Sequence, residues 1–369
     1  AMQILMAMMM LSMIFVMVII SQASAERICQ VLQEESTVQN PAQPVTDMAD
    51  GSIEFDHVTF RYSDSSEKPV LDDINLKIRS GMTVGIVGGT GSAKSSLVQL
   101  VPRLYDVSSG SLKVGGVDVR DYDLEALRDQ VSMVLQKNVL FSGTIAENLR
   151  WGNPNATDEE VRHAAQLAQA DGFVQEFPDK YDTYIEQGGS NVSGGQKQRV
   201  ALAGVLAMEP RVLILDEASS MLDPRGRKGL MKACRALHAR GMTIVMITHF
   251  MEEAAEADRV AVFRAGHVAM LGTPEEILTR ADELAQLNLD MPESCRLGMA
   301  LRTKGVPVHA QVREVDMVAE IAQAYAERSG ADTAGQSSAS QLEIADGTVP
   351  VDNEDNASEP VIELSLSLI

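Results

Sequence analysis

The chain has 369 residues, of which 52 are acidic and 31 basic, so its formal net charge at pH 7 is −21. Proteins that bind nucleic acid through its phosphates need a basic face, and this charge balance argues against that class of partner. Hydrophobic residues make up 45% of the chain, which excludes disorder throughout. Three cysteines, Cys29, Cys234 and Cys295, lie far apart, so we expect neither a disulfide framework nor a structural zinc site.

The first 20 residues carry no charged side chain. A helix of about 20 residues spans the roughly 30 Å hydrocarbon core of a bilayer. A signal peptide would begin with a basic region, whereas the first basic residue is Arg27, so the pattern favours a transmembrane helix. A buried soluble helix would show a polar stripe, which is missing here. We therefore predict a transmembrane helix within residues 1–35 and a linker over 36–52.

The other end of the chain has the opposite character. Residues 331–369 contain eight acidic residues and no basic ones, and small polar residues are frequent among them. Such segments bury too little apolar surface to offset the entropy of ordering. We predict an acidic, disordered tail over residues 331–369.

A glycine-rich segment follows an apolar strand in the first half of the chain. Residues 53–60 alternate like a half-buried strand, and residues 83–87 read as a buried one. A strand, a glycine-rich loop and a helix in this order are typical of a P-loop, which wraps the phosphates of a nucleotide. In such a loop Lys94 neutralises phosphates and Ser95 binds Mg²⁺. The predicted loop comprises Gly88, Gly89, Thr90, Gly91, Ser92, Ala93, Lys94, Ser95 and Ser96.

One position departs from the P-loop pattern, because the residue before the lysine is Ala93 and not glycine. If the backbone there needs a positive φ, the methyl group costs on the order of 1 kcal/mol. If the backbone is already helical, this cost vanishes. Since the rest of the motif is intact, we expect a helical conformation at Ala93.

A second buried strand, residues 212–215, is followed directly by Asp216 and Glu217. Next to a P-loop, Asp216 is a candidate for holding Mg²⁺, and Glu217 is a candidate general base for an attacking water. Because 122 residues separate Lys94 from Asp216, the sequence predicts a subdomain inserted between the two motifs.

This insert contains the segment NVSGGQKQR at residues 191–199, which resembles the LSGGQ signature of ATP-binding-cassette (ABC) proteins. The resemblance covers about residues 53–285. It implies an α/β P-loop NTPase cassette with an inserted helical subdomain at about 137–210, preceded by one transmembrane helix. It also implies ATP and Mg²⁺ as ligands.

The signature residues are Ser193, Gly194, Gly195 and Gln196. Ser193 is a good N-cap for the apolar-periodic helix that follows. In the ABC family this motif contacts the ATP held by the P-loop of a second cassette. The resemblance therefore implies a homo- or heterodimer of cassettes that pair head to tail.

Four further residues match motif positions of the ABC family. Tyr62 matches the aromatic residue that stacks on adenine. Gln136 matches the glutamine that contacts Mg²⁺ and couples to the membrane domain. Asp223 matches the D-loop aspartate, and His249 matches the switch histidine that positions the γ-phosphate.

Two subfamilies contribute to the resemblance. Residues 1–198 resemble a bacterial ABC exporter, from its last transmembrane helix into the cassette. Residues 199–330 resemble the ATPases of energy-coupling-factor importers, in which a helical extension (here 286–330) helps two ATPases pair. Two explanations for this change of subfamily are open: a natural fusion, and a sequence-assembly artefact that joins two genes. On this interpretation the membrane domain is incomplete.

The sequence thus predicts the ATP-hydrolysing subunit of an ABC transporter on the cytoplasmic side of a bacterial cell membrane. Its expected partners are a second cassette, transmembrane transporter domains and the membrane itself, without nucleic acid. Two alternatives remain: an ABC ATPase with no transport role, and a chimeric chain that binds ATP but forms no competent dimer.

Overall fold

The structure is a computed structural model that describes residues 2–63 and 65–328. The tail predicted for residues 331–369 lies outside this described part. The first element is α1, Met2–Leu32, a helix of 31 residues of which none is buried. It is long and apolar enough to cross a membrane, since a span needs about 20 predominantly apolar residues.

A six-stranded sheet forms the centre of the fold, in the order β12-β11-β3-β10-β9-β6. All neighbouring strands are parallel except the edge pair β11 and β12. Every residue of β3, β9 and β10 is buried, as is typical of parallel sheets covered on both faces. The strands are β3 Thr83–Gly88, β6 Val131–Val134, β9 Val212–Asp216, β10 Thr243–Ile247, β11 Arg259–Arg264 and β12 His267–Gly272.

A second, antiparallel sheet has the strand order β2-β1-β4-β5. Its strands are β1 Ile53–Phe60, β2 Leu71–Ile78, β4 Ser109–Val114 and β5 Val117–Asp118. The strand expected at residues 53–60 is confirmed, although an irregularity between Phe55 and Val58 shifts the alternation of buried residues. Residues of both sheets, such as Phe55 and Val245, belong to one hydrophobic core.

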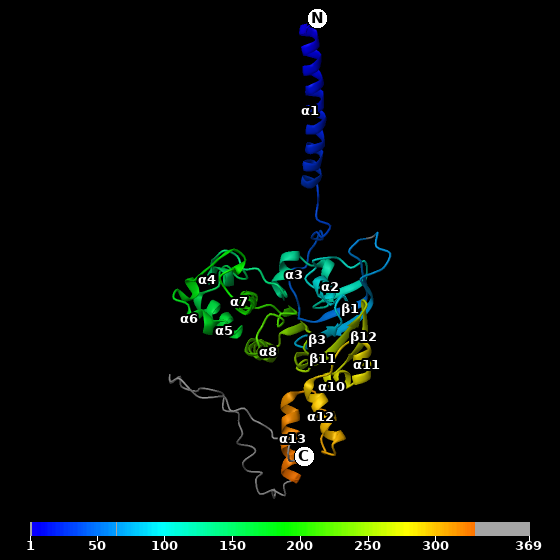
Figure 1. The fold of residues 1–369 in the computed structure, drawn as a ribbon, viewed down its shortest axis with the longest axis vertical. Coiled ribbons are helices and arrows are strands. Elements are labelled where there is room, and N and C mark those ends of the chain that lie inside the picture. The colour runs from blue at the N-terminus through cyan, green and yellow to red at the C-terminus, as the bar shows by residue number, and fades with distance from the viewer. Residues whose placement is uncertain (1, 64, 329–369) are drawn as a thin grey trace. The chain divides into compact units, whose positions relative to one another are not determined.

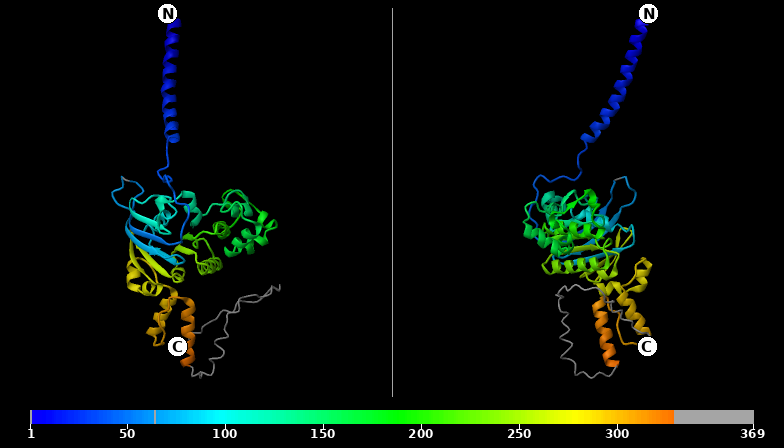
Figure 2. Two further views of the ribbon diagram at one scale, coloured as in Figure 1. Left: turned by 180° about the vertical axis from the view of Figure 1, so that it is seen from behind. Right: turned by 60° about the vertical axis from the view of Figure 1, so that its left-hand side comes forward.

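A group of helices lies between β6 and β9 in the sequence. It consists of α4 Ile145–Arg150, α5 Asp158–Leu167, α6 Asp171–Glu176 and α7 Gly194–Leu206, with the short pieces η2 Lys180–Asp182 and η3 Gln187–Gly189 and the small sheet of β7 Gly143–Thr144 and β8 Tyr184–Ile185. Capping boxes start α4, α5 and α7, and each satisfies two backbone N–H groups at the helix start. Figure 1 and the view from behind in Figure 2 show this group to one side of the sheets, away from α2 and β1.

The remaining helices connect and follow the strands. They are α2 Lys94–Leu100, η1 Val119–Asp121, α3 Leu124–Gln130, α8 Pro224–Ala239, α9 Met251–Ala254, α10 Pro274–Leu278, α11 Ala281–Gln286, α12 Glu293–Thr303 and α13 Glu314–Arg328. The segment predicted as a linker, residues 36–52, is fastened near α3. There Asn40 Nδ2 donates to Asp123 Oδ2 at 2.6 Å, and Asn40 Oδ1 accepts from Leu124 N at 2.9 Å.

Candidate functional site: the glycine-rich loop and the carboxyl ends of β9 and β10

A glycine-rich loop joins the end of β3 to the start of α2. Gly91 has φ 78°, a left-handed conformation that glycine adopts without strain, and a Cβ added there would meet no atom within 4 Å. Gly88 lies against the sheet, where an added Cβ would come within 2.4 Å of the Phe263 carbonyl oxygen. Gly88 thus allows close packing on β11, and Gly91 leaves the outer side of the loop open.

Ala93 caps the start of α2 with φ 73° and ψ 21°, which is a left-handed conformation. The expectation of a helical backbone at this residue is therefore wrong. This left-handed residue is the last one before α2, which begins at Lys94. A Cβ in this region costs roughly 1–2 kcal/mol, so Ala93 carries backbone strain that glycine would not have.

Lys94 lies inside the loop and is 5% exposed. Its Nζ donates to the carbonyl oxygens of Gly88 at 2.7 Å and Gly89 at 3.0 Å. Burial lowers the pKa of Lys94, while the charges of Glu217 and Asp216 act in the opposite direction. The loop thus holds a positive charge close to both carboxylates.

Asp216 is the last residue of β9 and is 7% exposed. Ser95 Oγ donates to Asp216 Oδ1 at 3.1 Å, which connects the loop to the end of this strand. Burial raises the pKa of Asp216, and the charge of Glu217 adds to this effect. The hydrogen bond from Ser95 and the charge of Lys94 oppose it.

The Ser95 hydroxyl and the Asp216 carboxylate fit a Mg²⁺ ion by the chemistry of their donors. Mg²⁺ prefers oxygen ligands, and in nucleotide sites one or two carboxylates hold it together with substrate phosphates. Within residues 2–63 and 65–328, no group of three or more His, Cys, Asp or Glu could hold a metal.

Glu217 and His249 form a close pair beyond the carboxyl ends of the adjacent parallel strands β9 and β10. His249 Nε2 lies 2.8 Å from Glu217 Oε1. The Glu217 backbone has φ 52°, and its N–H donates to the Ile247 carbonyl oxygen at 3.0 Å. The two side chains are 19% and 42% exposed, respectively, so solvent reaches the pair. A carboxylate held in this way can act as a general base.

Tyr62 lies just after β1 and is 51% exposed. Its hydroxyl donates to Ser96 Oγ at 3.0 Å, which places the ring beside the end of the glycine-rich loop. The rings of Phe60 and Tyr105 meet Tyr62 edge to face, with centroids 4.8 and 5.1 Å away. Sequence reasoning missed Tyr105 as a support for this ring, because it comes from a distant turn.

The signature motif starts α7 as predicted. The Ser193 side chain accepts from Gln196 N at 3.2 Å, and Gln196 Oε1 accepts from Ser193 N at 2.9 Å. A Cβ added to Gly195 would lie 3.6 Å from Leu222 Cδ2, so the motif packs beside the D-loop segment. Asp223 caps α8 by accepting from Gly226 N at 3.0 Å.

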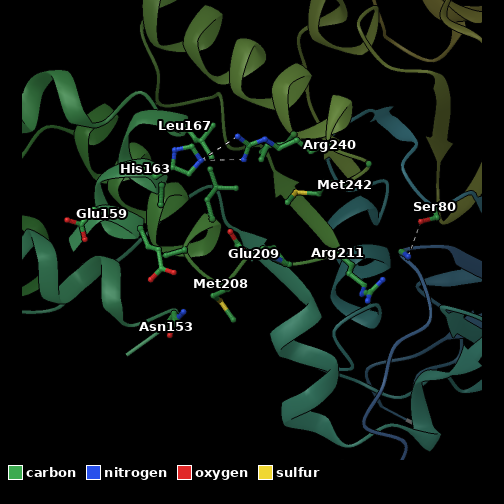
Figure 3. A pocket seen from close by; sticks show the side chains of 18 residues that line it. Ser80, Asn153, Glu159, His163, Leu167, Met208, Glu209, Arg211, Arg240 and Met242 are labelled. Carbon is green, nitrogen blue, oxygen red and sulfur yellow. Dashed lines mark hydrogen bonds between the residues drawn. The ribbon is translucent and has the colours of Figure 1, made fainter. Parts of the chain in front are cut away.

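A cavity of about 670 Å³ lies away from these residues. Its lining includes Ser80, Arg211 and Met242, which precede β3, β9 and β10, so it opens at the amino ends of the strands. In Figure 3, Arg240 points towards His163 across this cavity. The P-loop residues lie at the opposite, carboxyl ends, where parallel sheets bind ligands.

Comparison with known proteins agrees with this arrangement. A sequence profile described as ABC transporter matches residues 71–220. Multidrug export ATP-binding/permease proteins of Staphylococcus aureus strains COL and Mu50 are 40% identical over 253 residues, which is 68% of this chain and 43% of theirs. A solved bacterial Atm1-family ABC exporter with ATP bound superposes with a TM-score of 0.68 at 30% identity, over 75% of this chain and 49% of its own.

The chain contains an ABC transporter ATP-binding domain. The predicted fold class is confirmed, namely an α/β ABC cassette preceded by one long apolar helix. The chain spans less than half the length of these S. aureus relatives. Because the match covers 68% of this chain, similarity to exporters continues beyond residue 198. The importer resemblance of residues 199–330 stays a prediction.

The structure brings together most of the predicted residues of the ABC cassette. Contacts connect the glycine-rich loop with Asp216, and Glu217 with His249. Gln136 lies exposed two residues beyond β6, and its role at Mg²⁺ stays a prediction. Sequence reasoning missed Gln198, a buried residue of α7 whose Nε2 donates to the carbonyl oxygen of Leu135, next to Gln136, at 3.1 Å. Only a polar residue within an apolar helix face could have signalled it.

We expect Ala93→Gly to stabilise the ABC cassette. Removing the Cβ relieves roughly 1–2 kcal/mol of backbone strain. Glycine is more flexible in the unfolded chain, which lowers the free energy of unfolding by about 0.5–1 kcal/mol. A net gain of about 1 kcal/mol would raise Tm by about 2–4 °C in a domain of this size, as thermal unfolding would show. In Ala126→Gly, within α3, the same change should lower Tm. A fall in Tm for both variants would contradict the strain at Ala93.

Proposed function

We propose that the chain is the ATP-binding and ATP-hydrolysing part of an ABC exporter at a bacterial cell membrane, with the cassette in the cytoplasm. The Glu217–His249 pair carries this proposal, because it lies at the same sheet edge as the Lys94 loop and the Ser95–Asp216 contact. A phosphate-binding loop, a metal-binding pair and a general base are the parts that phosphoryl transfer to water requires.

Each residue has a defined task in this reaction. The backbone N–H groups of the loop and Lys94 bind the phosphates of ATP. Ser95 and Asp216 would hold Mg²⁺ with Gln136, and the ion would neutralise charge that develops on the phosphates. Glu217 takes a proton from the attacking water. His249, whose Nε2 lies 2.8 Å from Glu217 Oε1, would position the γ-phosphate.

We infer that the working unit is a dimer of cassettes, homo- or heteromeric. The signature residues begin α7, in the helical group that lies apart from α2 in Figure 1. Ser193 is exposed, so in a head-to-tail dimer it would contact ATP held by the other cassette.

The membrane partner is supported by two features. One is α1, whose residues are all unburied. The other is the pair Phe141 and Trp151 near the start and end of α4, which are 52% and 65% exposed and stack with centroids 4.4 Å apart. Exposed aromatic pairs of this kind are suited to protein–protein contact, so we propose that transmembrane transporter domains dock here.

The test of this function is Mg²⁺-dependent ATP hydrolysis by the purified full chain. If cassettes must pair, the rate per mole of chain should rise with protein concentration before it levels off. A constant rate per mole at all concentrations would argue for a monomeric ATPase or a preformed dimer, and size measurement at the same concentrations separates these two. Absence of hydrolysis at every concentration would contradict the proposed function.

A further inference from the structure

Glu253 is a buried carboxylate in α9, and the mechanism above does not use it. Its side chain is 5% exposed. Oε2 accepts two hydrogen bonds, from Thr248 Oγ1 at 2.6 Å and from Ser219 Oγ at 2.8 Å. Oε1 is buried without a hydrogen-bond partner in the described part of the chain. An unpaired buried oxygen destabilises a fold, so an apolar side chain would serve packing better.

The two hydroxyl groups belong to the segments that carry the proposed catalytic pair. Ser219 lies two residues after Glu217, and Thr248 is the residue directly before His249. Both are almost fully buried, at 4% and 1% exposure. One oxygen atom of Glu253 therefore joins the turn after β9 to the turn after β10.

Further contacts hold α9 in place beneath these turns. Phe250 N donates to Thr248 Oγ1 at 3.0 Å, and Glu253 N donates to the Phe250 carbonyl oxygen at 3.1 Å. The guanidinium of Arg227, in α8, lies 4.1 Å from the centre of the Phe250 ring. These contacts hold Glu253 in position, and the turns after β9 and β10 are both hydrogen-bonded to its side chain.

We propose that Glu253 is a positioning residue that sets the geometry between Glu217 and His249. The proposal rests on the proposed ATP hydrolysis at this site. Without the shared acceptor, the backbone hydrogen bond from Glu217 N to the Ile247 carbonyl oxygen remains, but Ser219 and Thr248 lose their link, and the 2.8 Å contact between Glu217 and His249 is held less firmly. Proton transfer depends steeply on such geometry, and a displacement of about 1 Å can lower a rate on the order of 100-fold.

Two substitutions at Glu253 separate hydrogen bonding from charge. Glu253→Ala removes the acceptor, and we expect kcat for ATP to fall on the order of 10- to 100-fold with little change in KM. Glu253→Gln keeps an oxygen that can accept from both hydroxyls, so it should retain most of the parental kcat. Glu252→Ala removes the neighbouring, exposed carboxylate of the same helix and serves as the matched control.

A second measurement does not need activity. The chain has six histidines, and NMR of the histidine rings in the full chain in detergent would report on His249, whose signal is the one lost in His249→Gln. We expect Glu253→Ala to shift this signal, whereas Glu253→Gln and Glu252→Ala leave it in place. If Glu253→Ala does not fold, Ser219→Ala removes one of the two hydroxyls and should shift the signal in the same direction.

Different outcomes of the two measurements contradict the positioning role of Glu253 and the proposed function. A parental chain that hydrolyses ATP, with Glu253→Ala at the parental kcat and an unmoved His249 signal, would overturn the positioning role. A parental chain without ATP turnover would overturn the proposed function. The His249 signal would still decide whether Glu253 determines the geometry between Glu217 and His249.

Discussion

Glu217→Gln is expected to abolish most ATP turnover and to leave ATP binding intact. Glutamine has the shape of glutamate and can still contact His249 Nε2, which lies 2.8 Å from Glu217 Oε1. It cannot take a proton from water, and loss of a general base typically lowers a rate on the order of 10²- to 10⁴-fold. Lys94, Ser95 and Asp216 are unchanged, so the phosphate-binding part of the site stays complete.

The measurement is steady-state ATP hydrolysis together with equilibrium binding of ATP, both on the full chain with Mg²⁺. Slow hydrolysis with retained ATP should also lengthen the life of the cassette dimer, which size measurement in ATP would detect. Glu252→Gln, at an exposed position in α9, is the control for loss of one carboxylate. Parental turnover by Glu217→Gln would show that another group activates the water.

Local sequence patterns predicted the elements of the fold and failed at one residue whose type does not match its backbone conformation. Ser193 is an example of success, because an N-cap depends only on the residue itself and the next turn of helix. Ala93 is an example of failure. Its backbone is left-handed (φ 73°) where the loop meets α2, although the residue is an alanine, which avoids this conformation when isolated.

Some contacts of the site residues could be predicted from the sequence, and others could not. The contact of Ser95 with Asp216 could be predicted, because the two motifs lie at the carboxyl ends of strands in one parallel sheet. The hydrogen bonds of Glu253 to Ser219 and Thr248 could not. In the sequence, Glu253 is one of two adjacent glutamates after a histidine, and only folding buries it and leaves Glu252 exposed.

Lys94→Ala is expected to weaken ATP binding by a factor of about ten to more than one hundred. The Lys94 ammonium is the buried positive charge that the loop offers to phosphates, and a hydrogen bond to a charged group contributes about 1.5–3 kcal/mol. Each 1.4 kcal/mol corresponds to roughly a tenfold change in affinity. Its loss also leaves Asp216 and Glu217 without the positive charge that acts on them. Titration with a fluorescent ATP analogue would measure the change.

Two further variants decide whether the charge or its exact placement in the loop matters. Lys94→Arg keeps the charge, but the planar guanidinium is larger and cannot make the same contacts with Gly88 and Gly89, so binding should recover only in part. Lys77→Ala removes an exposed lysine that pairs with Glu54 in the antiparallel sheet, and it should bind ATP as the parent does. Thermal unfolding of all three variants separates loss of the fold from loss of the phosphate contact. If folded Lys94→Ala bound ATP with parental affinity, the glycine-rich loop would hold phosphates through its backbone alone. The positive charge of Lys94 would then act on the Asp216 carboxylate and not on the phosphates.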